Sequence, residues 1–353
     1  MPRQRDLSTA RGEAAVARRP FQSTSAGQSA AVADGTVPPL EQVRSDVWAV
    51  ALPMPSGQHI GFSLAYLLRD ADGGIHVIDT GWDTDENWRV LADAVRAVGG
   101  QPEQIASVTV THMHPDHLGM VNRLRAASGA TVTLHAADAA AIAAGEPARW
   151  TEPALSRHLD EWGVPEGRRA EIYRLRDAQP APMFVAADTT VGDGDVLEVP
   201  GFSLRVMSTP GHTAGSICLR DDARAILFTG DHILPTMHAG LGLGGPTATN
   251  PLADYLRSLR AVAAFDDHEA LPGHGYRFTG LAARARRHER HHARRAAEVA
   301  AVLAADPNAS PWKIAAQLTW TAGWSNMTGF FLFSALTQTA MFREFVLGGG
   351  STD

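Results

Sequence analysis

The chain has 353 residues, of which 44% are hydrophobic, so it is long enough to bury a large core in one or two domains. Its 31 Lys and Arg residues against 38 Asp and Glu residues give a formal charge of −7, which argues against a generally nucleic-acid-binding protein and still permits local basic patches. A single cysteine, Cys218, excludes an intrachain disulfide, and no apolar run reaches the length of a membrane span.

The N-terminal residues 1–40 are polar and rich in small side chains, and we expect them to form a disordered leader. Arg18 and Arg19 faintly resemble a twin-arginine export signal, but the segment that follows has no hydrophobic stretch. We therefore predict a cytoplasmic protein.

From Ser45 onward, short apolar runs separated by proline and glycine predict strands over residues 46–52, 62–68 and 75–79. The third run closes at Asp79-Thr80-Gly81, and a helix is predicted from Asp85 to Val98. The Asp79 carboxylate either orients a ligand histidine or makes local turn hydrogen bonds, and this stretch alone favours neither alternative.

The densest group of potential metal ligands is Thr111-His112-Met113-His114-Pro115-Asp116-His117, which lies between a predicted strand at 107–111 and a helix predicted from Asp116 onward. In extended chain, His112 and His114 share a face and can hold one ion together. Pro115 fixes the turn, so Asp116 and His117 are free to serve a second ion. Imidazole and carboxylate suit zinc, with iron or manganese as alternatives.

A strand is predicted at 130–135 and a helix at 136–144, and the strand-like sequence patterns do not continue after them. Residues 146–182 are rich in charges and aromatic side chains and are predicted to form a helical insertion. It is either a wall over the site or a unit whose aromatic side chains anchor it to the scaffold.

Three later turns each deliver a ligand type next to glycine, at Gly211-His212, Gly230-Asp231 and Gly273-His274. The strands predicted around them cover residues 202–207, 216–220, 224–228 and 269–271. Each turn alone is of a common kind, but four strand ends that all offer metal ligands form a specific constellation.

The order His-x-His-x-Asp-His, Gly-His, Gly-Asp, Gly-His resembles the metallo-β-lactamase superfamily of binuclear hydrolases, and Asp79-Thr80-Gly81 resembles its early acidic turn. The resemblance spans residues 45–280 and implies an α+β fold, a four-layer αββα sandwich with two Zn²⁺ ions, or iron or manganese, along one edge. The implied ligands are His112, His114 and His212 for the first metal, Asp116, His117 and His274 for the second, and Asp231 as the bridge.

The resemblance implies a hydrolase in which a metal-bridging hydroxide is the nucleophile and Asp116 and Asp231 are the catalytic carboxylates. An acidic bridge is more similar to the thioesterase, glyoxalase II, lactonase and nuclease branches than to many true lactamases, which use cysteine or serine there. We therefore expect a carboxylic ester or thioester substrate. A single-strand endoribonuclease is the main alternative, and a β-lactamase and a persulfide dioxygenase are further ones.

The remaining residues, 281–353, are predicted to form a small helical unit after a catalytic domain at 41–280, and they resemble the winged-helix-like tail of a β-lactamase-like subgroup. The predicted helix at 281–303 is strongly basic over residues 284–295. This stretch can contact RNA, a carrier protein or coenzyme A phosphates, or it is a solvated face whose arginines pair with Glu289 and Glu298.

The helix histidines, His288, His291 and His292, lie far from the turn motifs in sequence and are predicted to be surface residues. Met237 and His238 lie beside the glycine-rich segment 240–245 and are candidate substrate contacts. An oligomer is compatible with this sequence, and no membrane partner is expected.

Overall fold

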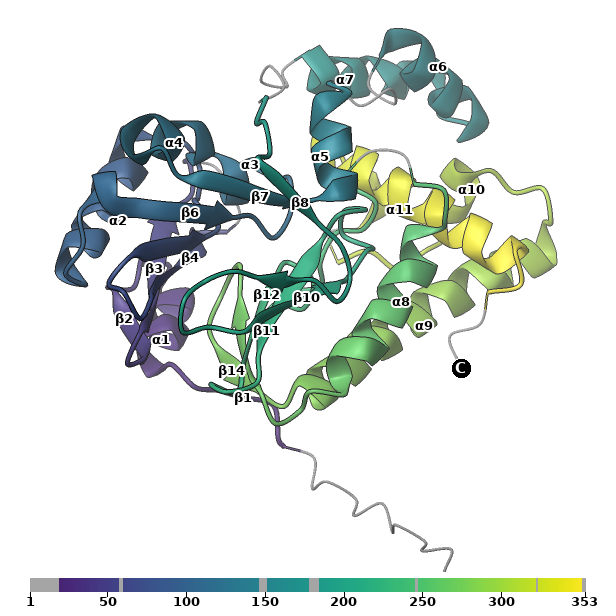
Figure 1. Ribbon diagram of the computed structural model, residues 1–353. Coiled ribbons are helices and arrows are strands. Elements are labelled where there is room, and N and C mark those ends of the chain that lie inside the picture. The colour runs from purple at the N-terminus through teal and green to yellow at the C-terminus, as the bar shows by residue number, and fades with distance from the viewer. Residues whose placement is uncertain are drawn as a thin grey trace, which may run out of the picture.

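The structure is a computed structural model that describes residues 19–56, 60–145, 151–177, 184–244, 247–321 and 323–350. Two seven-stranded sheets lie face to face, and helices cover the outer face of each (Figure 1). The predicted four-layer αββα sandwich is thereby confirmed.

The first sheet comes from the N-terminal half of the chain. Its strands, in spatial order, are β2 (Glu41–Arg44), β3 (Val47–Pro53), β4 (Phe62–Arg69), β5 (Ile75–Ile78), β6 (Ile105–Thr109), β7 (Thr131–His135) and β8 (Thr189–Val191). Strands β5 and β6 pair in parallel, so both end at the same edge of the sheet. The turn at Asp79 and the turn at His112 therefore begin side by side.

The second sheet contains the other ligand turns. Its strands, in spatial order, are β1 (Gln22–Ser23), β14 (Phe278–Thr279), β13 (Glu269–Pro272), β12 (Ile226–Gly230), β11 (Ile217–Asp221), β10 (Leu204–Ser208) and β9 (Val196–Leu197). Strands β12 and β13 are parallel, and β11 is antiparallel to both β10 and β12. Strands β10, β12 and β13 consequently all end at one edge, where His212, Asp231 and His274 follow.

Apolar side chains fill the space between the sheets. Tyr66 of β4 and Phe228 of β12 meet there with ring centroids 5.2 Å apart, and the Tyr66 hydroxyl donates to Pro272 O at 2.8 Å. On the outside, helix α2 (Asp85–Ala97) packs its apolar stripe on the first sheet, whereas α8 (Pro251–Ala263) and α9 (Leu281–Ala305) cover the second. Burial of each large aliphatic side chain stabilises the fold by about 1.5–3 kcal/mol. The well-packed core therefore holds the strand ends in fixed positions.

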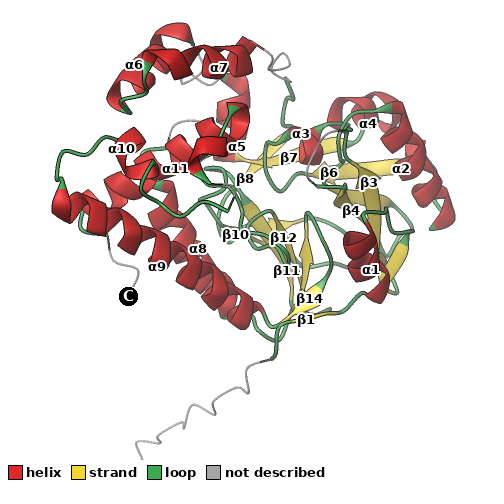
Figure 2. Cartoon of the chain, turned by 180° about the vertical axis from the view of Figure 1, so that it is seen from behind, coloured by secondary structure: helices red, strands yellow, loops and turns green. Residues whose placement is uncertain are grey.

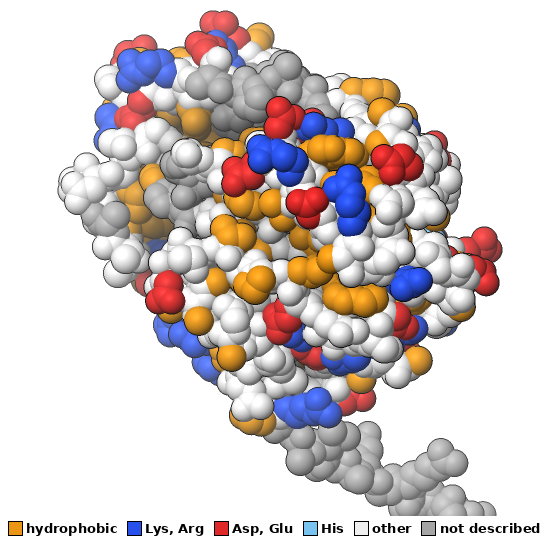
Figure 3. Space-filling model, turned by 90° about the vertical axis from the view of Figure 1, so that its left-hand side faces the viewer, with side chains coloured by type: hydrophobic (Ala, Val, Ile, Leu, Met, Phe, Trp, Pro, Cys, Tyr) orange, Lys and Arg blue, Asp and Glu red, His pale blue; other side chains and the backbone are white. Residues whose placement is uncertain are grey.

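The remaining helices are α1 (Ala26–Asp34), α3 (Pro115–Leu118), α4 (Val121–Ser128), α5 (Ala136–Ala143), α6 (Glu152–Glu161), α7 (Glu166–Asp177), α10 (Pro311–Ala315) and α11 (Gly329–Leu347), with 3-10 turns at Pro102–Gln104 and Trp324–Asn326. Among the described helices, none combines the length and apolar character needed to cross a bilayer. The face that carries α2 and α4 mixes positive and negative side chains with apolar ones (Figure 3).

The helix predicted from Asp116 onward is two helices, α3 and α4, which are separated at Gly119 and Met120. The backbone of the Asp79-Thr80-Gly81 turn passes so close that a Cβ atom on Gly119 would lie 2.5 Å from Gly81 O. The chain therefore restarts its helix at Val121, and β6 ends at Thr109, two residues earlier than predicted.

The prediction of a disordered leader at 1–40 is wrong for residues 19–40, and residues 1–18 lie outside the described residues. Strand β1 pairs with β14, and the Ser25 side chain caps α1 by accepting from Gln28 N. The Gln28 side chain in turn accepts from Arg277 N at 2.9 Å. Without this segment the edge of β14 would be left with unpaired backbone groups, which explains why a polar, small-residue stretch is ordered here.

The C-terminal unit is helical, but its described residues, 281–321 and 323–350, contain no strand that could form a wing. Helix α9 is part of the sandwich, because its Leu281 and Ala285 are buried in one core with Leu227 of β12. Phe342 of α11 joins the same core. The predicted boundary at residue 280 thus divides the sequence without dividing the hydrophobic core.

The described part of the predicted insertion, residues 151–177, is helical and lies against the C-terminal helices (Figure 2). Leu155 and Leu159 of α6 share a small core with Leu336 of α11, and the rings of Trp162 and Phe333 lie 5.8 Å apart. The aromatic side chain of Trp162 therefore anchors the insertion to α11, which is the second of the two alternatives considered above.

Candidate metal centre

Seven acidic and histidine side chains meet at the edge of the sandwich where β6, β10, β12 and β13 end. They form three groups of three residues that share members. In each group, one potential ligand atom from each residue lies within 4.8 Å of the other two. The groups are His112, His114 and His212; Asp116, His117 and His274; and His112, His117 and Asp231. The structure thus brings together every residue that the resemblance assigned to the two metals.

The first triad directs three imidazole nitrogens at one point. His212 Nε2 lies 2.9 Å from His114 Nδ1 and 3.2 Å from His112 Nε2. The opposite nitrogens face acceptors, since His212 Nδ1 donates to Gly240 O at 2.6 Å and His114 Nε2 to Leu243 O at 3.3 Å. A neutral imidazole that donates from one nitrogen carries a lone pair on the other, so lone pairs converge where a cation would sit.

The second triad follows the same rule. His117 Nδ1 donates to Asp79 Oδ2 at 2.7 Å, and His274 Nδ1 donates to Phe62 O at 3.0 Å. The Nε2 atoms of both rings are buried, and neither makes a hydrogen bond within the described residues, although His274 Nε2 lies 3.1 Å from Asp116 Oδ2. Buried polar atoms normally have a partner, so these nitrogens fit a divalent cation.

Asp231 lies between the two triads. Its Oδ2 is 3.4 Å from His274 Nε2 and 3.7 Å from His212 Nε2, while its Oδ1 is 3.4 Å from His117 Nε2. One carboxylate therefore faces both groups of nitrogens, as a ligand shared by two cations must.

The two triads hold their protons differently when no cation is bound. Burial, followed by repulsion from His114, lowers the pKa of His212 to about 4, so the first triad presents neutral rings. Burial also opposes the charge on His274, but Asp231 and Asp116 outweigh it and raise its pKa to about 10. In return, His274 and His117 outweigh burial and hold the pKa of Asp231 well below its usual range. A cation at the second triad would displace protons.

Asp79 supports this centre from below. Its carboxylate accepts from Thr111 N at 2.7 Å, from Thr111 Oγ1 at 2.8 Å and from His117 Nδ1. Its backbone has φ of 59°, in the left-handed region that non-glycine residues seldom adopt. This geometry matches the first alternative for Asp79, in which the carboxylate orients a histidine.

Asp138 of α5 is a contributor that the sequence did not reveal. It accepts from Met113 N and Gly215 N at 2.8 Å each and from Thr213 Oγ1 at 2.9 Å. The carboxylate therefore ties the turn between His112 and His114 to the turn after His212. A single acid in an alanine-rich helix carries no motif that could have indicated this role.

Met237 and His238 contact α9 rather than the seven side chains. Met237 O accepts from Arg284 Nη2 at 2.7 Å, and the rings of His238 and His291 stack with centroids 3.9 Å apart and planes at 9°. The prediction that the α9 histidines are surface residues is wrong for His288 and His292, which are 0% and 3% exposed. Their side of the helix faces α11 and residues 232–238, which a charged sequence pattern cannot show.

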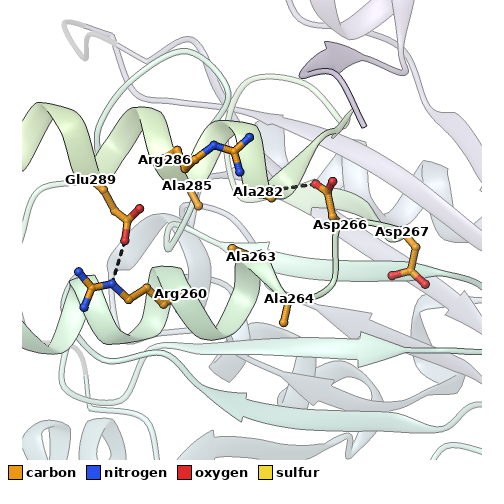
Figure 4. Close-up of a pocket in the computed structure, with 9 residues that line it drawn as sticks. All are labelled: Arg260, Ala263, Ala264, Asp266, Asp267, Ala282, Ala285, Arg286 and Glu289. Atoms are coloured by element: carbon orange, nitrogen blue, oxygen red, sulfur yellow. Dashed lines mark hydrogen bonds and ion pairs between the residues drawn. The ribbon is translucent and has the colours of Figure 1, made fainter. Parts of the chain in front are cut away.

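A surface hollow of about 540 Å³ lies elsewhere, between the end of α8 and the start of α9 (Figure 4). Arg260 and Glu289 form an ion pair across it, and Asp266 accepts from Ala282 N at the start of α9. None of the seven side chains lines this hollow.

The sequence profile of the metallo-beta-lactamase superfamily matches residues 60–274. The chain belongs to this superfamily. A Bacillus subtilis protein named "Probable metallo-hydrolase YqjP" is 29% identical over 246 residues, which cover 67% of this chain and 74% of that protein. The bovine protein named "Acyl-coenzyme A thioesterase MBLAC2" is 36% identical over 124 residues, which cover 34% of this chain and 39% of the thioesterase.

The likeness to a solved structure extends beyond the profile match. The crystal structure of a metallo-beta-lactamase family protein from Thermus thermophilus superposes with a TM-score of 0.68 at 25% identity. It covers 87% of this chain and 95% of the Thermus protein. The uncovered 13% of this chain is shorter than residues 281–353, so the shared fold includes at least part of that helical region.

Proposed function

We propose that this chain is a dinuclear metal hydrolase that cleaves a carboxylic thioester or ester. The observation that carries the proposal is the position of Asp231 between two triads of inward-facing nitrogens. In this proposal the first ion binds His112, His114 and His212, the second binds Asp116, His117 and His274, and Asp231 contacts both. Zinc is the proposed metal, with iron or manganese as alternatives.

Divalent ions at such a pair of sites polarise a carbonyl group and activate a water molecule. The chain's own contribution is to fix the ligands and to provide ionised carboxylates. Asp116 is held ionised because His117 and His274 outweigh the effect of burial on its pKa. Its side chain is 14% exposed, so the carboxylate can accept a hydrogen bond from an attacking water and orient it.

Two observations narrow the substrate. The acidic side chain of Asp231 between the two triads disfavours a β-lactam, and a relative with 36% identity over the matched segment carries the name of an acyl-coenzyme A thioesterase, which favours a thioester. That segment covers about two fifths of the relative, so the substrate is proposed from the site and the partial match together.

The test combines metal analysis with a panel of substrates. The purified protein is expected to contain about two divalent ions per chain and to hydrolyse acyl-coenzyme A thioesters faster than lactones, a β-lactam or single-stranded RNA. Asp231→Ala should lower both metal content and hydrolysis, whereas Asp34→Ala, at an exposed position of α1, should change neither.

Several results would contradict the proposal. Hydrolysis that survives complete removal of metal, or an Asp231→Ala protein with unchanged metal content and rate, would exclude the dinuclear site. Cleavage of RNA in place of thioesters would favour the endoribonuclease alternative. Oxygen consumption with a persulfide would identify the dioxygenase branch instead.

A further inference from the structure

We propose that the face of α9 beside residues 234–238 is an anion subsite that binds the phosphate of the substrate's thiol portion, as found in coenzyme A and phosphopantetheine. This inference rests on the proposed thioester hydrolysis and specifies the substrate class. It assigns the subsite to Arg287, His291 and Arg294 of α9 and to His238.

The subsite residues share one face of α9. Positions 284, 287, 288, 291 and 294 recur at intervals of three and four residues, which places their side chains along one side of a helix. Residues 282, 285, 286 and 289 line the hollow shown in Figure 4 and belong to another side. The basic stretch of α9 therefore divides into two faces. Only the face that carries Arg284, Arg287 and His291 lies next to residues 234–238, which follow Asp231 in the chain.

Arg284 fixes this face to the loop. Its side chain is 2% exposed and donates to Leu234 O at 2.6 Å and to Met237 O at 2.7 Å. The stacking of His238 on His291 follows from this attachment. Both hydrogen bonds go to backbone carbonyls, and among the described residues no carboxylate pairs with Arg284. Arg284 therefore positions the loop and keeps its positive charge.

The loop also connects the subsite to the metal centre. Two residues after His238, Gly240 O accepts from His212 Nδ1, and Leu243 N donates to His212 O at 2.9 Å. Two residues of chain span at most about 7 Å, so His238 lies close along the chain to Gly240, whose carbonyl group contacts the proposed metal ligand His212. A substrate whose carbonyl group reaches the metals can therefore extend its thiol portion over His238 and His291.

The charges on this face lack acidic partners. Arg287 and Arg294 are exposed, and neither forms an ion pair with a carboxylate in the described ranges. The alternative in which the α9 arginines pair with Glu289 and Glu298 is confirmed for Arg295, which pairs with Glu298. It is wrong for Arg287 and Arg294, and Glu289 pairs with Arg260 of α8 instead. A bound phosphate would supply the missing negative charge.

The positive charges of the α9 arginines also affect the pKa of His238. Burial, then His291 and three arginines of α9, lower the pKa of His238 to about 3, so the ring is neutral at working pH. Its Nδ1 is buried and has no hydrogen-bond partner in the part of the chain that is described, so a phosphate would meet the partly exposed face of the ring rather than this atom. The free guanidinium groups of Arg287 and Arg294 are the groups that would donate charge-assisted hydrogen bonds to a phosphate.

A third cation site is disfavoured by the same observations. The groups of side chains whose potential ligand atoms converge are, within the described residues, all in the centre at the strand ends. The rings of His238 and His291 are parallel rather than directed at a common point, and the nearby arginines would repel a cation.

The test compares thioesters that share one acyl group and differ in phosphate: acyl-coenzyme A, acyl-4′-phosphopantetheine and acyl-pantetheine. For Arg287→Gln/Arg294→Gln, we expect kcat/KM with acyl-coenzyme A to fall by roughly 10- to 100-fold, the range for lost hydrogen bonds to a charged group. The loss should appear mainly in KM, and kcat/KM with acyl-pantetheine should stay within about twofold of the unmodified protein.

The matched control is Arg89→Gln/Arg96→Gln on α2, which removes the same charge from the mixed face in Figure 3. It should leave all three substrates within about twofold, except for a small uniform effect at low salt. A loss with acyl-coenzyme A alone would assign the subsite to the nucleotide phosphates, whereas a loss shared with acyl-4′-phosphopantetheine would assign it to the phosphate of the pantetheine arm.

Two results would overturn the inference. Equal losses with acyl-coenzyme A and acyl-pantetheine would show that these arginines act through the structure, and unchanged kinetics would show that they do not contact the substrate. Competition by single-stranded RNA but not by adenosine 3′,5′-bisphosphate would identify a nucleic-acid surface and contradict it equally.

Failure of the proposed function can be separated from failure of this subsite. If no thioester is hydrolysed, the proposed function is wrong, and binding of adenosine 3′,5′-bisphosphate to the metal-loaded protein then tests the subsite alone. Calorimetric binding that weakens roughly tenfold or more in Arg287→Gln/Arg294→Gln, and not in the α2 control, would sustain the subsite. Absent or unaltered binding would refute it.

Discussion

The Asp79 carboxylate lies 2.7 Å from His117 Nδ1 and joins two strand ends, because it also accepts both the backbone N–H and the hydroxyl of Thr111. It holds the His117 ring with Nε2 directed at Asp231 and Asp116. The second triad therefore depends on a residue 38 positions earlier in the chain.

We predict that Asp79→Asn weakens binding of the second metal by roughly 10- to 100-fold, the usual effect of removing a carboxylate that orients a ligand histidine. The amide cannot accept from all three donors, so the ring loses its fixed orientation. Metal titration with a competing chelator measures the change, and Asp72→Asn, at an exposed turn position, is the control. Equal affinities in the two variants would refute the role of Asp79.

Asp138→Asn is predicted to disturb the first triad in particular. One of the three donors would meet the amide NH₂ group in place of an oxygen, at a cost of about 1–3 kcal/mol. We expect lower thermal stability and a metal content that falls from two ions towards one. If Asp138→Asn lowered the thermal stability but left the metal content unchanged, Asp138 would act only on folding.

Gly273→Ala is predicted to lower metal content strongly. The new Cβ atom would lie 2.5 Å from both Asp231 Oδ1 and His117 Cε1, so these two side chains must move. Gly167→Ala on α7 meets no atom within 4 Å and is the control, with an expected gain in stability of up to about 1 kcal/mol. Full metal content in Gly273→Ala would contradict the close packing of this turn.

Acid is predicted to destabilise the helical layer through His292. Burial, then His291, lowers the pKa of His292 to about 3, whereas the unfolded chain takes up a proton below about pH 6.5. Protons therefore bind the unfolded state more strongly, and stability falls as the pH drops from about 6.5 towards 3.

The matched variant for this effect is His292→Leu, which cannot take up the proton. Between pH 7.5 and pH 5, the stability of the variant relative to the unmodified protein should improve by up to about 2 kcal/mol. Chemical denaturation at the two pH values measures it. An unmodified protein and variant with the same pH dependence would mean that His292 is not held neutral in the fold.

The sequence predicted the strand ends well, because ligand residues beside glycine after short apolar runs leave a local pattern. His112, His212, Asp231 and His274 are all found where those patterns placed them. It failed where a contact is made by residues without a local pattern. The β1 strand and α1 look like a polar leader, and only their pairing with β14 and Arg277 orders them.

By itself the sequence determined the ligand types, their order and the kind of fold, since these follow from hydrophobic periodicity and from motifs a few residues long. Only the tertiary structure decided that the imidazole lone pairs converge, that Asp138 joins two ligand turns, and that α9 turns His288 and His292 inward. The physical reason is that a side chain's orientation and burial depend on long-range packing. Residues more than a hundred positions apart, such as His112 and Asp231, become neighbours only when both sheets are assembled.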